Sequence, residues 1–173
     1  MKTMKPILSQ WAANPFYFKD YGLEKDIDVS FCGQVYGDRM GWLDGMKVER
    51  YGKGQSNGMV EFKDLAKIYN RSKICINFSK GSNGGMQIKC RPFEVTASKS
   101  LLLCEYVEGI ENYFEIDKEI VCFKTKEDLK ENITYYLEHG DEREATTRAG
   151  YERTLKDHLW KNRLEEIFKE ASK

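Results

Sequence analysis

The feature that most constrains the fold of this chain is a series of short apolar runs separated by polar segments with helical spacing. Residues 74–78 and 101–104 are almost continuously apolar, as is typical of parallel strands that are buried on both faces. Helical segments between such strands favour an α/β domain, in which helices cover both faces of a sheet. The predicted strands are residues 28–33, 48–52, 74–79, 100–106 and 119–123.

Helical signals fill the segments between these strands. Phe62, Leu65 and Tyr69 recur at helical spacing, which predicts an amphipathic helix over residues 61–70. Thr125 with Asp128 resembles a capping box at the start of a helix that Gly140 is expected to end. Further helices are predicted at residues 39–46, 90–98 and 141–158, and from residue 160 to near the C-terminus. The pattern predicts a Rossmann-like, three-layer α/β domain with a mostly parallel sheet.

The first 27 residues differ from the rest because they show no sustained period. They contain Pro6, Pro15 and the aromatic run 16–18, and they are interpreted as a linker-like segment that lies over another part of the protein. We therefore divide the chain into a segment 1–27 and a Rossmann-like domain 28–173.

Charge and cysteine content restrict the class of protein. The chain has 173 residues, and its 28 lysines and arginines balance its 28 aspartates and glutamates. No net charge attracts it to nucleic acid or to an anionic membrane. Its five cysteines are an odd number without a C-x-x-C pair, which favours reduced thiols over a disulfide or metal role.

The sequence also bears on location. No apolar stretch approaches the ~20 residues of a membrane span, and residues 1–6 lack the apolar region of a secretion signal. We expect a cytoplasmic protein.

The loop of residues 33–39 follows the first predicted strand and contains Gly33 and Gly37. Ligands of open parallel sheets bind at the carboxyl ends of the strands. Glycines there let backbone amides approach an anion, with Arg39 at the start of a helix. The alternative is a plain tight turn with a solvated Arg39.

Residues 89–94, Lys-Cys-Arg-Pro-Phe-Glu, enter a helix after a flexible glycine loop that includes Gly84 and Gly85. Lys89 and Arg91 suit a diphosphate. The Glu94 carboxylate, one turn into the helix, can accept hydrogen bonds from the two hydroxyls of a ribose. The alternative is that Glu94 pairs with these cations as surface ions, which contribute little. For His139 and His158, we expect helix-end and packing or hydrogen-bonding roles.

The ordered series of these segments resembles the spore-maturation CgeB-type glycosyltransferases. The similarity covers roughly residues 11–168. It is carried by residues 28–33, 36–39, 51–54, 68–79, 89–95, 101–106 and 149–153, with His158, Arg163 and Leu164.

This resemblance implies one half of a GT-B fold, the C-terminal domain that holds a nucleoside diphosphate sugar. Arg39, Lys89 and Arg91 would bind the donor diphosphate, and Glu94 would bind its ribose. Tyr51, Gly52, Phe78 and Ser79 would flank the base. The nucleotide sugar is then a substrate. We expect no cofactor and no metal, because three cations can neutralise the charge of the leaving diphosphate without one.

The sequence departs from related retaining transferases at one position. Met86 stands eight residues before Glu94, where the first glutamate of an E-x7-E motif would lie. The chain is also expected to begin near the interdomain hinge, so that transfer needs an acceptor-binding domain or a separate subunit. A non-catalytic nucleotide-binding module is the alternative, and homodimer formation is left open.

Overall fold

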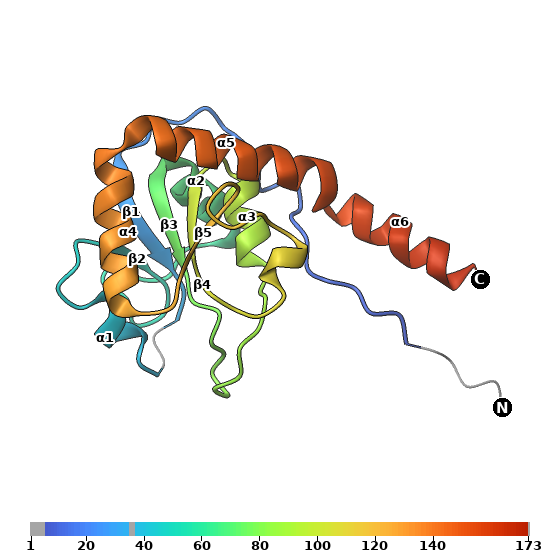
Figure 1. The fold of residues 1–173 in the computed structure, drawn as a ribbon, viewed down its shortest axis with the longest axis horizontal. Helices are drawn as coiled ribbons and strands as arrows, with labels where there is room; N and C mark the ends of the chain where they lie inside the picture. Colours follow the sequence, from blue (N-terminus) through green and yellow to red (C-terminus); the bar gives the residue numbers. More distant parts are fainter. Residues whose placement is uncertain (1–5, 35–36, 173) are drawn as a thin grey trace.

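The computed structural model describes residues 6–34 and 37–172, so Val35 and Tyr36 of the predicted glycine loop lie outside the described residues. Its centre is a parallel sheet of five strands in the order β2-β1-β3-β4-β5 (Figure 1). The strands are β1 (Ile27–Cys32), β2 (Glu49–Tyr51), β3 (Ser72–Asn77), β4 (Leu101–Glu105) and β5 (Val121–Phe123). All five predicted strands are therefore present, and their boundaries differ from the predicted ones by only a few residues.

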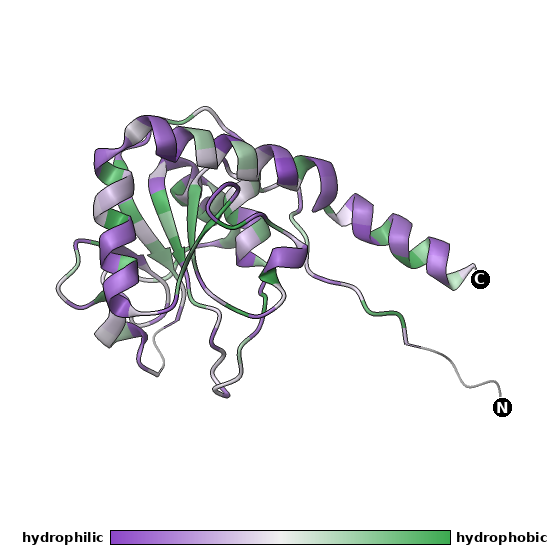
Figure 2. Ribbon diagram, in the orientation of Figure 1, coloured by the Kyte–Doolittle hydropathy of each residue, from purple (hydrophilic) through white to green (hydrophobic). Residues whose placement is uncertain are grey.

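Successive side chains of the strands enter two separate apolar layers. Ile74 and Ile76 of β3 face one layer with helix residues Leu43 and Leu129, whereas Cys75 faces the other. Figure 2 shows the hydrophobic strands between helices whose outer faces are hydrophilic. Helices cover both faces of a parallel sheet, which confirms the predicted three-layer, Rossmann-like α/β fold.

The helices follow the predicted order. They are α1 (Arg39–Leu43), α2 (Phe62–Arg71), α3 (Arg91–Ala97), α4 (Lys126–Glu138), α5 (Gly140–Asp157) and α6 (Trp160–Ala171), with a short 3-10 turn η1 (Ile110–Asn112) that was not predicted. The capping box is confirmed, because Asp128 N donates to Thr125 Oγ1 at 3.0 Å and Thr125 N donates back to Asp128. Helix α4 ends at Glu138 with His139 as its C-cap, so the helix stops just before Gly140, and Gly140 is itself the first residue of α5.

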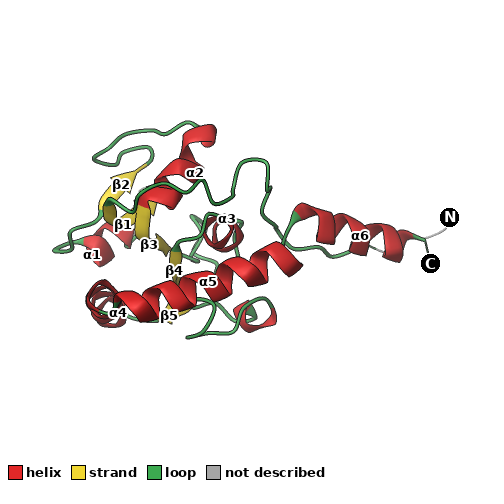
Figure 3. Cartoon of the chain, turned by 90° about the horizontal axis from the view of Figure 1, so that it is seen from above, coloured by secondary structure: helices red, strands yellow, loops and turns green. Residues whose placement is uncertain are grey.

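Helix α5 crosses the edge of the sheet where the strands begin, and α6 projects beyond it beside the N-terminal segment (Figures 1 and 3). Ala13 forms a parallel bridge with Leu159 between the two helices. Ala13 and Phe18 are buried in the core, and Asn70 of α2 bonds the backbone of Tyr21 and Lys19. Residues of the predicted linker-like segment thus pack on the domain, while the division at residues 27 and 28 stays a prediction.

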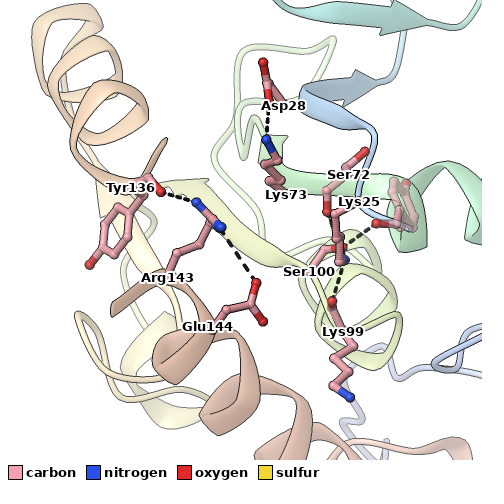
Figure 4. Close-up of polar contacts among 10 residues, drawn as sticks. Lys25, Asp28, Ser72, Lys73, Lys99, Ser100, Tyr136, Arg143 and Glu144 are labelled. Atoms are coloured by element: carbon pink, nitrogen blue, oxygen red, sulfur yellow. Dashed lines mark hydrogen bonds and ion pairs between the residues drawn. The ribbon is translucent and has the colours of Figure 1, made fainter. Parts of the chain in front are cut away.

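A half-buried lysine holds this same edge together. The amine of Lys25 donates to the carbonyls of Ser72 and Lys99, at 2.9 and 2.7 Å, and to Ser100 Oγ at 2.6 Å (Figure 4). Burial lowers the pKa of Lys25. These hydrogen bonds join the segment before β1 to the first residue of β3 and to the residues before β4, so Lys25 ties the strands together at the amino edge.

Two further predictions concern the whole chain. All five cysteines are free thiols, and Cys32, Cys75 and Cys104 are buried in the core. Among residues 6–34 and 37–172, no helix combines the length and apolar character needed to cross a bilayer.

Candidate functional site

A cleft of about 380 Å³ opens at the carboxyl ends of β1, β2 and β3. This volume lies in the range of small-molecule sites, roughly 300–1,000 Å³. Its lining comes from the strand ends, from the loops after β1 and β2, and from the entry to α3. The lining residues are Phe31, Cys32, Gly33, Gln34, Arg39, Tyr51, Gly52, Lys53, Met59, Val60, Leu65, Asn77, Phe78, Lys89 and Arg91.

Arg39 enters this cleft from the first residue of α1. The residue is only 7% exposed. Its Nη1 donates to Gln34 O at 3.1 Å, and its Nη2 donates to Lys80 O at 2.8 Å. The alternative of a solvated Arg39 is therefore excluded. The guanidinium instead ties the loop after β1 to the loop after β3, with its carbon 5.7 Å from the ring centroid of Phe78.

Lys89 lies beside Arg39 on the same wall. Its Nζ donates to Phe78 O and to Lys80 O, both at 2.8 Å. Burial and then the charge of Arg39 lower the pKa of Lys89 to about 8. An ammonium group held next to another cation in a partly dry site is stabilised by an anion, so this wall favours a negatively charged ligand.

Arg91 contributes a third cation from the first residue of α3, and it donates an Nη1 hydrogen bond to the hydroxyl of Tyr69. Lys53 adds a fourth, from the loop after β2. The described residues that line the cleft thus include four cations and no carboxylate. The whole chain carries no net charge. The positive charge of the cleft is therefore a local concentration and does not reflect the composition of the chain.

Glu94 is only 8% exposed, and burial raises its pKa against the opposing influence of Arg91 and a hydrogen bond with Cys90. This burial rules out the alternative in which Glu94 is a surface ion. The side chain lies one turn beyond Arg91 and is not part of the described cleft lining. Its ribose-binding role stays a prediction.

The residues expected to flank a base divide into two groups. Tyr51, Gly52 and Phe78 line the cleft. Ser79 does not, because its buried hydroxyl donates to Glu105 O at 2.6 Å. Gly52 is required at its position: it has φ 133°, and a Cβ there would lie 2.3 Å from Gly33 O.

The predicted flexible loop forms a closed turn. Gly81 N donates to Gly85 O at 2.7 Å, and Gly84 N donates to Gly81 O at 3.0 Å. Lys80 and Met86 form an antiparallel bridge at its base. Gly84 and Gly85 lie outside the described cleft lining, and their mobility stays a prediction.

Family comparison identifies the chain. A family model described as glycosyl transferase-like matches residues 19–169, which is most of its length. The chain belongs to this family.

Solved structures agree with this fold assignment. The glycosyl transferase-like chain superposes on sucrose-phosphate synthase from Thermosynechococcus elongatus with a TM-score of 0.73 at 11% identity, covering 94% of this chain and 51% of that one. The chain also superposes on the pneumococcal O-GlcNAc transferase GtfA, solved with UDP and GlcNAc, with a TM-score of 0.67 at 14% identity. This match covers 93% of this chain and 38% of that one. The glycosyl transferase-like chain thus spans about half of the first chain and less than half of the second, and it matches one Rossmann-like half of a GT-B fold.

A third structure is a single domain. It is the C-terminal domain of the group 1 glycosyl transferase LpcC from Francisella tularensis, with a TM-score of 0.62 and 8% identity. The match covers 86% of this chain and 99% of that domain. Among curated proteins, no significant sequence match was found.

The histidines of the glycosyl transferase-like chain lie away from the cleft. His158 places Nε2 2.7 Å from Tyr113 O and Nδ1 3.0 Å from Nη2 of Arg163. A carbonyl accepts and a guanidinium donates, so the neutral ring with its proton on Nε2 satisfies both. Burial lowers the pKa of His158. These contacts confirm the predicted hydrogen-bonding role, and His139 Nδ1 lies 2.8 Å from Tyr135 O at the end of α4.

Several lining residues were not predicted as site residues. Asn77 ends β3, and Gln34 follows the glycine after β1, so their positions at strand ends could have indicated them. The helical spacing predicts Leu65 on the apolar face of the helix over residues 61–70, and no pattern in the sequence predicts a function for Met59 or Val60. Within the described ranges, no group of three histidine, cysteine or acidic side chains could hold a metal ion.

Proposed function

We propose that this chain is the donor-binding half of a glycosyltransferase of the CgeB type, and that its cleft holds a nucleoside diphosphate sugar. The observation that carries the proposal is the cleft itself, in which four cations and no carboxylate share a lining with apolar residues such as Val60 and Leu65. A diphosphate needs the cations, and a nucleobase needs the apolar surface.

In this proposal, Arg39, Lys89 and Arg91 contact the diphosphate, while Tyr51, Gly52 and Phe78 flank the base. Glu94 would bind the ribose. The cations would stabilise the charge that develops on the leaving diphosphate, which is a large term in such reactions. The complex of GtfA with UDP and GlcNAc provides a precedent for the ligand class on this fold.

Transfer also needs an acceptor. Catalysis by proximity requires both substrates in one site, and this chain spans about half of the sucrose-phosphate synthase chain that it resembles. We propose that an acceptor-binding half completes the enzyme, either as a domain or as a separate subunit. Met86 favours a second candidate, a nucleotide-binding module without transfer, because no carboxylate stands eight residues before Glu94.

Calorimetry with UDP, GDP, ADP, dTDP and CDP, each beside its free nucleoside, tests the donor site. We expect selective binding of one diphosphate. Arg39→Ala should weaken that diphosphate about tenfold or more, since a hydrogen bond to a charged group contributes roughly 1.5–3 kcal/mol. The free nucleoside should keep its affinity.

Arg148→Ala is the matched control, because Arg148 is an exposed arginine of α5, on the amino edge. It should leave both affinities unchanged. The donor-site proposal fails if the wild-type protein binds none of the five diphosphates. The phosphate role of Arg39 fails if diphosphate and nucleoside lose affinity equally.

A further inference from the structure

One arginine of the described cleft, Arg91, forms a hydrogen bond with a tyrosine of the protein core, Tyr69. Tyr69 lies on α2 with 1% exposure, and its ring stacks on Phe18 with centroids 6.2 Å apart and planes at 29°. Its backbone carbonyl accepts a hydrogen bond from Ser100 Oγ. Both the ring and the backbone of Tyr69 are therefore fixed by the folded core.

The hydroxyl of Tyr69 reaches from this core to the cleft. It accepts a hydrogen bond from Nη1 of Arg91, and the guanidinium carbon of Arg91 lies 5.9 Å from the centroid of the same ring. Residues 69 and 91 thus join α2 to the start of α3 at the cleft wall. A phenylalanine would fill the same core volume, and a buried hydroxyl is costly unless it is hydrogen-bonded. The hydroxyl is therefore explained by its contact with Arg91.

A phenol differs from a carboxylate as a partner for arginine. Burial raises the pKa of Tyr69 well above its usual value, so the hydroxyl stays neutral. A neutral acceptor orients a guanidinium without cancelling its charge, whereas an aspartate in the same place would compete with an anionic ligand. The contact fixes the direction of Arg91 and leaves its positive charge available to the cleft.

We infer that Tyr69 is a positioning residue, which sets the guanidinium of Arg91 toward the phosphate groups of the bound nucleotide. This inference rests on the proposed function, and it adds to it a residue that does not itself line the described cleft. Tyr69 acts only through Arg91, so its hydroxyl matters for phosphate groups and not for the base or the ribose.

The test is calorimetry on Tyr69→Phe with the tightest of the five diphosphates and its matching nucleoside. We expect the diphosphate to bind about three- to tenfold more weakly, the effect of one neutral hydrogen bond. The nucleoside should bind unchanged. Arg91→Ala probes the same contact from its other side, and the double variant should bind no more weakly than Arg91→Ala alone, since the two residues act as a unit.

Tyr136→Phe is the matched control, because Tyr136 of α4 is a buried tyrosine in the opposite layer. It should not change either affinity. Equal binding of the diphosphate by Tyr69→Phe and wild type would overturn the inference, as would equal losses for diphosphate and nucleoside, or additive losses in the double variant. Failure of the proposed function is a different result, namely no diphosphate binding by the wild type, and it would remove the inference as well.

Discussion

At the scale of single residues, the cleft wall brings two cations to one oxygen. Arg39 Nη2 and Lys89 Nζ both lie 2.8 Å from the backbone carbonyl of Lys80. Like charges repel each other, and the partial burial of Lys89 reduces the screening of this repulsion by solvent. The lowered pKa of Lys89 is the result of burial and of this repulsion. An anion between the two side chains would remove the repulsion, so the wall is better suited to the bound state than to the free one.

This arrangement predicts a pH dependence of diphosphate binding. Lys89 has a pKa of about 8 in the folded protein, so it loses most of its charge between pH 7 and pH 9. At pH 9 only about one tenth of the free protein carries the charge, which limits the loss of affinity from this group to about tenfold. We expect calorimetry to show weaker binding at pH 9 than at pH 7. Lys89→Met should reduce affinity at pH 7 and flatten the profile.

Unfolding does not account for this expected loss. The folded pKa of Lys89 is lower than the unfolded value, so the unfolded state holds more protons between about pH 8 and 10.5, and this group makes the free energy of unfolding rise across that interval. Lys130→Met on the exposed side of α4 is the control, and its profile should match wild type. A wild-type affinity that is constant from pH 7 to pH 9 would show that the charge of Lys89 does not contribute to binding.

The sequence predicts some residues of the site and misses the contacts of others. The cations could be assigned because Arg39 and Lys89 follow strand ends, and chain order places the carboxyl ends of parallel strands at one edge. The sequence could not predict that the Ser79 hydroxyl bonds to the carbonyl of Glu105 and does not line the cleft, because a serine after a strand can point to either side of the sheet. The contact between Tyr69 and Arg91 was equally hidden, because it depends on how α2 and α3 pack.

At the scale of elements, the glycines of α5 illustrate what local patterns miss. Gly140 lies between two helical segments, and its residue type suggested a stop, yet the chain continues at once into α5. Gly150 lies in the middle of the same helix, where glycine costs about 1 kcal/mol relative to alanine. The reason for this glycine is tertiary. A Cβ at residue 150 would lie 2.2 Å from the carbonyl oxygen of Glu119, just before β5.

We predict that Gly150→Ala destabilises the protein although alanine is the better helix former. The added methyl group must displace the backbone at Glu119 or move α5 outward. Overpacking of this kind costs about 1–3 kcal/mol, which corresponds to a Tm decrease of roughly 2–12 °C for a domain of this size. Thermal unfolding followed by circular dichroism measures the change.

Gly140→Ala is the control in the same helix. A Cβ there meets only Arg143 Nη2, at an ordinary contact distance of 3.6 Å. The change should leave Tm unchanged or raise it slightly through helix propensity. If both variants gain stability equally, the close approach of α5 to Glu119 does not limit the helix position.

At the scale of the whole molecule, α6 extends away from the sheet with an apolar stripe (Figure 2). Trp160, Leu164 and Phe168 are exposed, and they recur every four residues on one helical face. Trp11 of the N-terminal segment packs edge-on against Trp160 with ring centroids 6.3 Å apart, and it is exposed as well. Such exposed apolar surface marks an interaction site or leads to association.

The isolated chain should therefore self-associate through α6, a concrete form of the open question of a homodimer. Sedimentation velocity at increasing concentration should show a rising average mass for the wild type. The double variant Leu164→Glu/Phe168→Glu should remain monomeric, because it places charges in the stripe where Phe168 is 67% exposed. Lys169→Glu on the same helix alters charge at a polar position and should associate as the wild type does. If the double variant and the wild type gain mass equally, the contact lies elsewhere, and the part of the cleft lining around the exposed Met59 becomes the next surface to change.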